Sequence, residues 1–210
     1  MLGTDADNTP RGPLITYQES SMFRSSAIVG AVLCAIAGFL FVLQATVPNS
    51  AEASDRPKSK ADAGMTPTKK AEALGVKFEK LKPTYLNPCA KAGKLLFTSG
   101  HTSKIKGRLG ADLKVEDGYK AARECCVEIL RAVWNTHGTL DNLRVVKVLG
   151  CVNSHPDFVD QPKVVNGCSD MLHQIFGAKT DGWHARSALG FASLPNGAAV
   201  EVEAIFEIKD

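Results

Sequence analysis

The 210-residue chain has few aromatic side chains, 7% of its residues, and no large excess of charge of either sign. Its formal net charge at pH 7 is +3, and the lysines and arginines are spread along the sequence instead of forming one run. A surface that binds nucleic acid usually carries a basic stripe with interleaved aromatic side chains. The composition therefore gives no reason to expect a nucleic-acid partner.

Cysteine and histidine lack the spacing of a metal site or a disulfide framework. The six cysteines are too sparse for a disulfide scaffold, and neither they nor the five histidines form paired ligand motifs. Cys125 and Cys126 are adjacent on a predicted helix and would point in different directions. We interpret the cysteines as small apolar core residues, with a redox role as the alternative, and we expect neither a metal nor a cofactor.

The N-terminal 82 residues are expected to precede the folded domain. Residues 1–21 are polar without periodicity and are predicted to be disordered. Residues 22–47 hold a long apolar run, which is typical of a signal sequence or of a transmembrane anchor. Residues 48–82, rich in Ala, Lys, Asp, Ser and Pro, are predicted to form a linker.

The apolar run is compatible with a cleaved signal sequence or with an uncleaved membrane anchor. It is longer than a usual signal-peptide core and slightly short of the roughly 20 residues that span a bilayer comfortably. The segment Ser50-Ala51-Glu52-Ala53 has the small-residue pattern of a cleavage site, whereas an uncleaved run would stay as an anchor. We expect targeting to an organelle, a plastid or mitochondrion, or membrane association through residues 27–47, but not a simple cytosolic location.

Residues 83–210 are predicted to form one α+β domain in the order β-β-α-β-α-β-β. Hydrophobic periodicity of about 3.6 residues predicts two helices, and apolar alternation bounded by turn residues predicts the strands. The helices are expected at 115–134 and 162–176, and the strands at 85–89, 94–99, 143–152, 185–192 and 199–208. The two helices would cover one face of a single sheet.

The second face of such a sheet would be left without a covering layer. Leu96, Val146 and Ile205 are strand residues that would then need a partner. Because a domain of this size rarely exposes a large apolar surface to water, self-association is expected.

Arg186 and Glu201 are the candidate site residues. Arg186 starts a strand with small or apolar neighbours, and we expect that strand to pair, across the turn at 194–197, with the last strand. Glu201 and Glu203 occupy one face of that last strand. A guanidinium binds carboxylates bidentately, and a nearby glutamate is a candidate base. A salt bridge between Arg186 and either glutamate within the sheet is the purely structural alternative.

Several motifs occur in an order that resembles one family. They are Phe97-Thr98-Ser99-Gly100, Leu143-Arg144-Val145-Val146-Lys147-Val148, Pro156-Asp157-Phe158 followed by Asn166, and the segment from Ala185-Arg186-Ser187 through Leu194-Pro195 to Glu201-Val202-Glu203-Ala204-Ile205. Together they resemble the Rid (YjgF) family over about residues 83–210. The resemblance implies a chorismate-mutase-like fold and a homotrimer with sites between subunits. The best-known members hydrolyse enamines and imines released by pyridoxal-phosphate enzymes.

The resemblance also assigns roles to individual residues. Arg186 matches the residue that holds a substrate carboxylate, and Glu201 matches the carboxylate that positions water. Ser99 and Gly100 match a strand end that lines the pocket, and the Ala188 backbone carbonyl would assist. Tyr85 matches an aromatic lid with a spacing difference of one residue, and Asn166 matches when the loop before it is longer than in short members.

Three positions depart from the usual family pattern. His184 replaces a proline two residues before Arg186, Ala188 replaces a frequent cysteine, and His101 replaces a glutamine after Ser-Gly. The chain therefore lacks the family's reactive thiol, and it resembles a less characterised subgroup more than the standard deaminases. His184 is expected to fill the position of the missing proline, and the alternative is that it touches the substrate or tunes pKa values beside Arg186.

The resulting hypothesis is hydrolytic deamination of 2-imino or enamino acids to 2-keto acids and ammonia. In a 2-imino acid the carboxylate is bonded to the electrophilic carbon. The enzyme would need one group that binds the carboxylate and another that positions a water beside the carbon. One alternative is a noncatalytic trimeric scaffold, or a ligand-binding subunit, tethered to a membrane complex. Another alternative is cleavage of single-stranded RNA.

Overall fold

A computed structural model describes residues 64–82 and 85–210. The predictions for residues 1–21 and 22–47, and for the linker as far as residue 63, lie outside the described residues. No helix within 64–82 and 85–210 is long and apolar enough to cross a membrane. The apolar run at 27–47 is not part of that finding.

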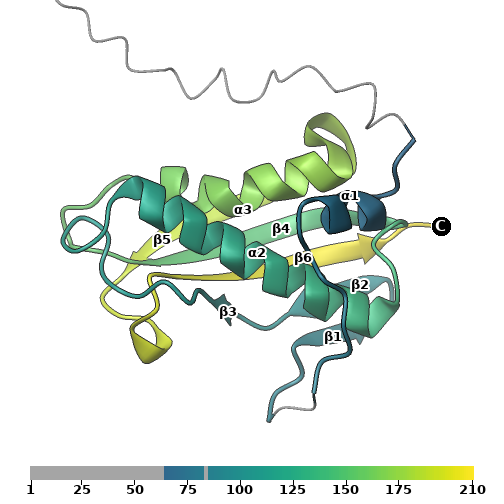
Figure 1. Ribbon diagram of the computed structural model, residues 1–210, viewed down its shortest axis with the longest axis horizontal. Helices are drawn as coiled ribbons and strands as arrows, with labels where there is room; N and C mark the ends of the chain where they lie inside the picture. Colours follow the sequence, from purple (N-terminus) through teal and green to yellow (C-terminus); the bar gives the residue numbers. More distant parts are fainter. Residues whose placement is uncertain (1–63, 83–84) are drawn as a thin grey trace, which may run out of the picture. The chain divides into compact units, whose positions relative to one another are not determined.

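The described residues form an α+β unit with one sheet and two long helices on one of its faces (Figure 1), which confirms the predicted fold class. The strands are β1 (Cys89–Ala92), β2 (Leu95–Thr98), β3 (His101–Thr102), β4 (Leu143–Asn153), β5 (Ala185–Phe191) and β6 (Val200–Ile208). The helices are α1 (Pro67–Ala73), α2 (Val115–His137) and α3 (Gln161–Phe176), with short turns of helix at η3 (Gly177–Asp181) and η4 (Pro195–Gly197).

The order of strands in the sheet is β1-β2-β6-β4-β5, and β3 also pairs with β6. β4 pairs antiparallel with β6 and parallel with β5. The expected pairing of β5 with β6 is therefore wrong, because β4 lies between them. The physical reason is the β4-α3-β5 connection, in which a helix returns the chain to a parallel strand beside the first. Residues 192–199 then cross the end of β4 to reach β6.

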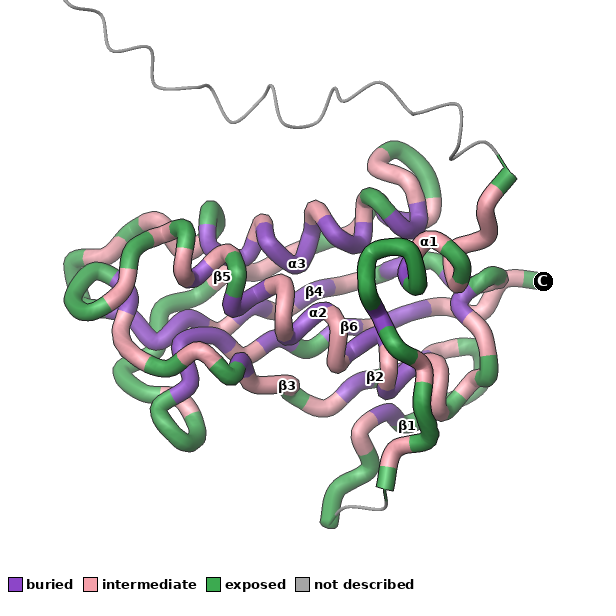
Figure 2. Tube along the Cα trace, in the orientation of Figure 1, coloured by how far each residue is buried: buried purple, intermediate pink, exposed green. Residues whose placement is uncertain are grey.

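The core lies between the helices and one face of the sheet (Figure 2). In β6 the buried residues alternate with the glutamates, so Val200, Val202, Ala204 and Phe206 face the helices as predicted. Leu96 also faces the helices and is fully buried, so its expected need for a partner is wrong. Phe97, which pairs with Ile205, occupies the other face instead.

The other face of the sheet, which we call the open face, carries exposed apolar side chains. Phe97, Leu189 and Phe191 expose 39%, 49% and 41% of their surface. Their positions in the strand pairing place them on the side opposite the buried residues. No helix of the described residues covers this face in Figure 1.

The folded unit begins earlier than the predicted boundary at residue 83. Thr66 caps α1, and Pro67 starts the helix where its missing N–H is not needed. Ala71 and Val76 are buried in the core, and the Thr68 N–H donates to Asp141 Oδ1 over 2.8 Å. Residues 66–82 therefore belong to the domain. Their apolar content is too low to signal this in sequence, because only a few side chains reach the core.

The hairpin partner of β2 is β1 at Cys89–Ala92, not residues 85–89. Ala92 pairs with Leu95, so Gly93 and Lys94 form a two-residue turn. Gly93 has a φ of 60°, which such a turn favours. A turn this short requires the partner strand to end immediately before it, and the sequence prediction did not apply that constraint.

Helices α2 and α3 cross at close range. Gly167 of α3 lies against the backbone carbonyl of Tyr119 in α2, and a Cβ at this position would overlap that oxygen. Gly118 in turn lies against Val164. Glycine at these positions lets the helices approach closely enough to bury their cysteine and aliphatic faces together.

We expect Gly167→Ala to lower the free energy of unfolding by about 3 kcal/mol, because backbone atoms cannot move aside as a side chain can. Urea unfolding followed by circular dichroism would measure the change. Gly138→Ala is the control, since its Cβ would meet nothing within 4 Å and only its φ of 91° opposes alanine. That variant should lose about 1 kcal/mol. Equal losses in the two variants would contradict the packing argument.

Candidate functional site

Arg186 is anchored to α3 through one end of its guanidinium. In β5 it pairs with Val148 of β4, which is buried, so Arg186 points to the helix side of the sheet. Its Nη1 donates to Asn166 Oδ1 over 2.8 Å and to Ser169 Oγ over 3.1 Å. Both Nη1 hydrogens are thus used. Nε and Nη2 make no hydrogen bond to any described residue, so that edge of the guanidinium remains for a ligand.

The electrostatic surroundings of Arg186 favour an anionic ligand. The side chain is half-buried, and this burial lowers its pKa, while Cys168 and Asp170 act in the opposite direction. An arginine keeps its charge at neutral pH even so. A partly buried guanidinium with an unpaired edge gains more from a carboxylate than an exposed one, because less water competes for it.

Glu201 lies on the open face of the sheet. It pairs with Cys151 of β4 and with Thr102 of β3. Its carboxylate covers Gly100, where a Cβ would overlap Oε1. Burial raises the pKa of Glu201, and the negative charge of Glu203 raises it further. A carboxylate with a raised pKa is a stronger base than an ordinary glutamate.

Arg186 and Glu201 do not meet within one chain. β4 separates their strands, and their side chains leave the sheet on opposite faces. In the described residues no hydrogen bond or ion pair joins Arg186 to Glu201 or Glu203, so the alternative of a salt bridge within the sheet is wrong. Each residue belongs to a separate half-site.

The remaining predicted site residues divide between the two halves. Asn166 holds Arg186, and Ala188 lies on the same side of β5, opposite Gly150. Ser99 and Gly100 lie on the Glu201 side, where the Ser99 hydroxyl donates to the Asn87 carbonyl over 2.8 Å. The Arg186 half-site is therefore Arg186, Asn166 and Ala188, and the Glu201 half-site is Glu201, Ser99 and Gly100.

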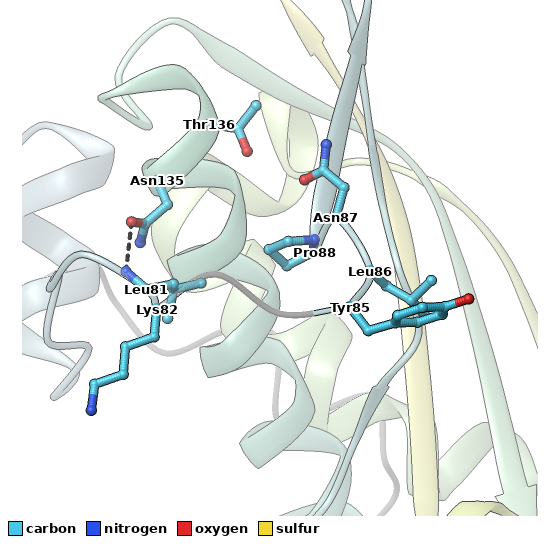
Figure 3. A pocket seen from close by; sticks show the side chains of 8 residues that line it. All are labelled: Leu81, Lys82, Tyr85, Leu86, Asn87, Pro88, Asn135 and Thr136. Atoms are coloured by element: carbon cyan, nitrogen blue, oxygen red, sulfur yellow. Dashed lines mark hydrogen bonds between the residues drawn. The ribbon is translucent and has the colours of Figure 1, made fainter.

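Tyr85 is fully exposed and contacts neither half-site residue in the described hydrogen-bond network. Figure 3 shows it at the rim of a surface pocket between the segment before β1 and the last turns of α2. The pocket is lined by Leu81, Lys82, Tyr85, Leu86, Asn87, Pro88, Asn135 and Thr136. Asn87 connects this segment to Ser99, so Tyr85 lies closer along the chain to the Glu201 half-site.

Ser169, which the sequence prediction missed, and His184, which it expected mainly to replace a proline, lie next to Arg186. The Ser169 hydroxyl lies 3.0 Å from His184 Nε2, and His184 Nδ1 lies 2.6 Å from the Gly182 carbonyl oxygen. Two signals were present: Ser169 follows Asn166 by one helical turn, and His184 precedes Arg186 by two strand residues. The family pattern, which has proline at position 184, concealed them.

No group of three or more His, Cys, Asp and Glu side chains within 64–82 and 85–210 could hold a metal ion. Cys151, beside Glu201, has a raised pKa because of burial and of the charges of Glu201 and Glu203. Its thiol is therefore protonated at neutral pH. The charged groups of the two half-sites are therefore the Arg186 guanidinium and the Glu201 carboxylate.

Comparison with known proteins finds one family model along most of the domain. The model described as "YjgF/chorismate_mutase-like, putative endoribonuclease" matches residues 71–205. Protein TCP17 of Trypanosoma cruzi is 42% identical over 126 residues, which cover 57% of this chain and 78% of that protein.

Two solved structures share the architecture. A protein of unknown function from Agrobacterium tumefaciens is 36% identical, with a TM-score of 0.61, over 69% of this chain and 93% of its own. A Shewanella oneidensis protein named a "putative endoribonuclease" is 27% identical, with a TM-score of 0.62, over 69% of this chain and all of its own. The match begins at residue 71, in agreement with the earlier domain start seen in the structure.

We expect Glu203→Gln to lower the pKa of Glu201, because it removes the neighbouring negative charge that raises it. Carboxyl carbon NMR during a pH titration would measure the shift. Glu207→Gln is the matched control, since Glu207 lies on the same face of β6 and pairs with Arg144 instead. An unchanged Glu201 pKa in Glu203→Gln would show that burial alone raises it.

Proposed function

Because the chain belongs to the YjgF/chorismate-mutase-like family, we propose that it hydrolyses 2-imino acids and their enamine forms to 2-keto acids and ammonia. Each site would combine Arg186 of one subunit with Glu201 of another. The observation that carries the proposal is the division into half-sites: a cation with an unpaired edge on one face and a base on the other. Members of this family form homotrimers, which would supply the second copy.

The open face supports such an assembly. Phe97, Leu189 and Phe191 lie on it, and a second copy would remove their apolar surface from water. Glu201 is on the same face, so covering it would also exclude water from around the carboxylate. The assembly that buries the apolar side chains is therefore the one that would complete the site.

Arg186 would bind the substrate through its carboxylate. The Nε–Nη2 edge presents two parallel N–H groups, which match the two oxygens of a carboxylate. In an acyclic 2-imino acid the C=N carbon is bonded directly to that carboxylate. Fixing the carboxylate therefore fixes the position of the electrophilic carbon.

Glu201 would act as the base for water. Water adds to the C=N carbon while Glu201 takes one of its protons, and Glu201 gives that proton to the imine nitrogen, which becomes the amine of a carbinolamine. Glu201 then takes the hydroxyl proton and returns it to the amine, so the C–N bond breaks, ammonia leaves and the hydroxyl oxygen becomes the ketone. One water is consumed and one ammonia is released. The Ala188 carbonyl would assist, Gly100 gives Glu201 its space, Ser99 fixes the neighbouring loop, and Tyr85 would cover the occupied site.

A mixing experiment tests the shared site. Arg186→Ala and Glu201→Gln homo-oligomers should each lose at least about 100-fold in kcat/KM, since one lacks the clamp and the other the base. After the two variants are unfolded together and refolded at equal amounts, about one quarter of the interfaces should combine an intact Arg186 with an intact Glu201. Keto-acid formation from an enzymatically generated 2-imino acid should recover to about that fraction of wild type.

The control is a mixture refolded separately and combined afterwards, in which subunits are not exchanged. It should stay inactive. Mixed oligomers without recovered activity would contradict a site shared between subunits, whereas an Arg186→Ala protein as fast as wild type would contradict the proposed reaction itself.

The acid limb of the pH profile should report Glu201. Glu201 accepts a proton, so kcat/KM should fall as the pH decreases through its pKa, which lies above that of an ordinary glutamate. Arg186 stays charged over this range and contributes no step. Rates corrected for spontaneous imine hydrolysis would measure the limb, and Glu203→Gln should move it to lower pH. A limb that does not move would assign it to another group.

Cleavage of single-stranded RNA is the second candidate function, because the family description and the Shewanella protein both carry the name endoribonuclease. The same purified wild-type, Arg186→Ala and Glu201→Gln proteins would be incubated with labelled single-stranded RNA. Cleavage by wild type that Arg186→Ala and Glu201→Gln abolish, together with no imine hydrolysis, would favour RNA over imino acids.

A further inference from the structure

Ser169 occupies the space between Arg186 and His184. It lies in α3 with only 5% of its surface exposed, and its Oγ is 3.1 Å from Arg186 Nη1 and 3.0 Å from His184 Nε2. A buried hydroxyl in a helix commonly donates to the carbonyl one turn earlier. Here His184, in the segment just before β5, lies within hydrogen-bond distance of the hydroxyl instead.

The Gly182 carbonyl decides the direction of each hydrogen bond. A carbonyl oxygen can only accept, so His184 Nδ1, at 2.6 Å from it, carries the hydrogen. In a neutral ring Nε2 is then an acceptor, and the Ser169 O–H donates to it. The Ser169 oxygen is left with its lone pairs toward Arg186 Nη1, which donates to it.

The surroundings of His184 favour the neutral ring that this direction needs. Burial lowers the pKa of His184, and the nearby His173 and Arg186 lower it further, while the bond to Gly182 has the opposite effect. The ring of His173 in α3 lies 5.3 Å from that of His184 between centroids. Asp170 is the acidic group of α3 near this cluster, and its charge acts on His173 and Arg186.

We propose that Ser169 and His184 are positioning residues that orient the Arg186 guanidinium for the substrate carboxylate. This inference rests on the proposed function for the identity of the ligand. Asn166 and Ser169 together hold both Nη1 hydrogens, so the guanidinium plane is fixed and its Nε–Nη2 edge points away from α3. His184 sets the Ser169 hydroxyl so that an oxygen lone pair, and not the hydrogen, faces Nη1.

The proposal gives His184 a role that a proline at this position could not have. Proline has no side-chain acceptor for the Ser169 hydrogen. Hydrogen bonds that run in one direction, from Arg186 through Ser169 and His184 to Gly182, also polarise one another. The chain therefore fixes its carboxylate clamp by means of residues outside the general family pattern.

Three variants test the hydrogen bonds from Arg186 through Ser169 and His184 to Gly182, which we call the relay. Ser169→Ala and His184→Phe should each weaken 2-oxobutanoate binding by about 10-fold and raise KM similarly, with kcat changed by less than about 3-fold. His184→Gln, whose amide oxygen can accept from Ser169, should restore binding to within about 3-fold of wild type. Calorimetry with the full-length oligomer measures the affinity. Unchanged binding in both Ser169→Ala and His184→Phe would overturn the proposal.

A double-mutant cycle distinguishes positioning from a general structural effect. Lysine at position 186 has no Nη1 to be fixed, so adding Ser169→Ala to Arg186→Lys should cost about nothing more in affinity. A structural role for Ser169 would produce the same loss in both backgrounds, and that outcome would overturn the positioning role. Oligomer mass and unfolding midpoint of each variant identify any that fail to fold.

The histidine tautomer tests the relay without any activity. Nitrogen-15 NMR of the wild-type protein should show His184 with its hydrogen on Nδ1 and none on Nε2 at neutral pH. A hydrogen on Nε2 would overturn the relay even if the enzyme is an active deaminase. Conversely, a protein with the Nδ1 tautomer and tight, Ser169-dependent binding of 2-oxobutanoate but no imine hydrolysis would retain the relay and reject the proposed reaction.

Discussion

The parallel pairing of β4 with β5 is the constraint on which the rest of the structure depends. The β4-α3-β5 connection is a parallel crossover, and in this sheet it sets β5 beside β4, so β4 lies between β5 and β6. β4 becomes an interior strand with β6 on one side and β5 on the other, and its buried residues Val148 and Val152 lie on the face that the helices cover. The separation of Arg186 from Glu201 follows from this arrangement and not from either side chain.

Strand parity then assigns each charged group to a face. Arg186 is level with Val148 and turns toward α3, where Asn166 and Ser169 hold it, while Glu201 is level with Cys151 and turns toward the open face. The proposed hydrolysis needs both groups at one substrate, so Arg186 and Glu201 would have to come from different copies of the chain. The apolar side chains on the same open face give the same indication, because covering them with another surface would remove apolar area from water.

Local patterns were sufficient to predict the two long helices and the last strand, but not which strands pair. The periodicity of residues 115–134 and 162–176 predicted the two long helices, and the alternation in residues 199–208 predicted which face the glutamates occupy. Pairing is a long-range property, and the short turn at 194–197 suggested a hairpin, whereas β5 pairs with β4 instead. Residues 66–82 were missed because Ala71 and Val76 contribute too little apolar surface to mark a helix that packs on the core.

A family pattern can identify Arg186 as a candidate carboxylate receptor, but it does not predict how the guanidinium is oriented. The arginine could be identified by its place in an ordered set of motifs, yet its free edge depends on what the other end of the guanidinium contacts. Those contacts come from Asn166, which the pattern contains, and from Ser169, which it does not and which in turn bonds to His184. A fold fixes where a functional group stands, but the residues one contact away decide how that group is oriented and which hydrogens it can offer. The departure from the family pattern at position 184 therefore brings in a hydrogen-bond partner for Ser169 that a proline could not supply.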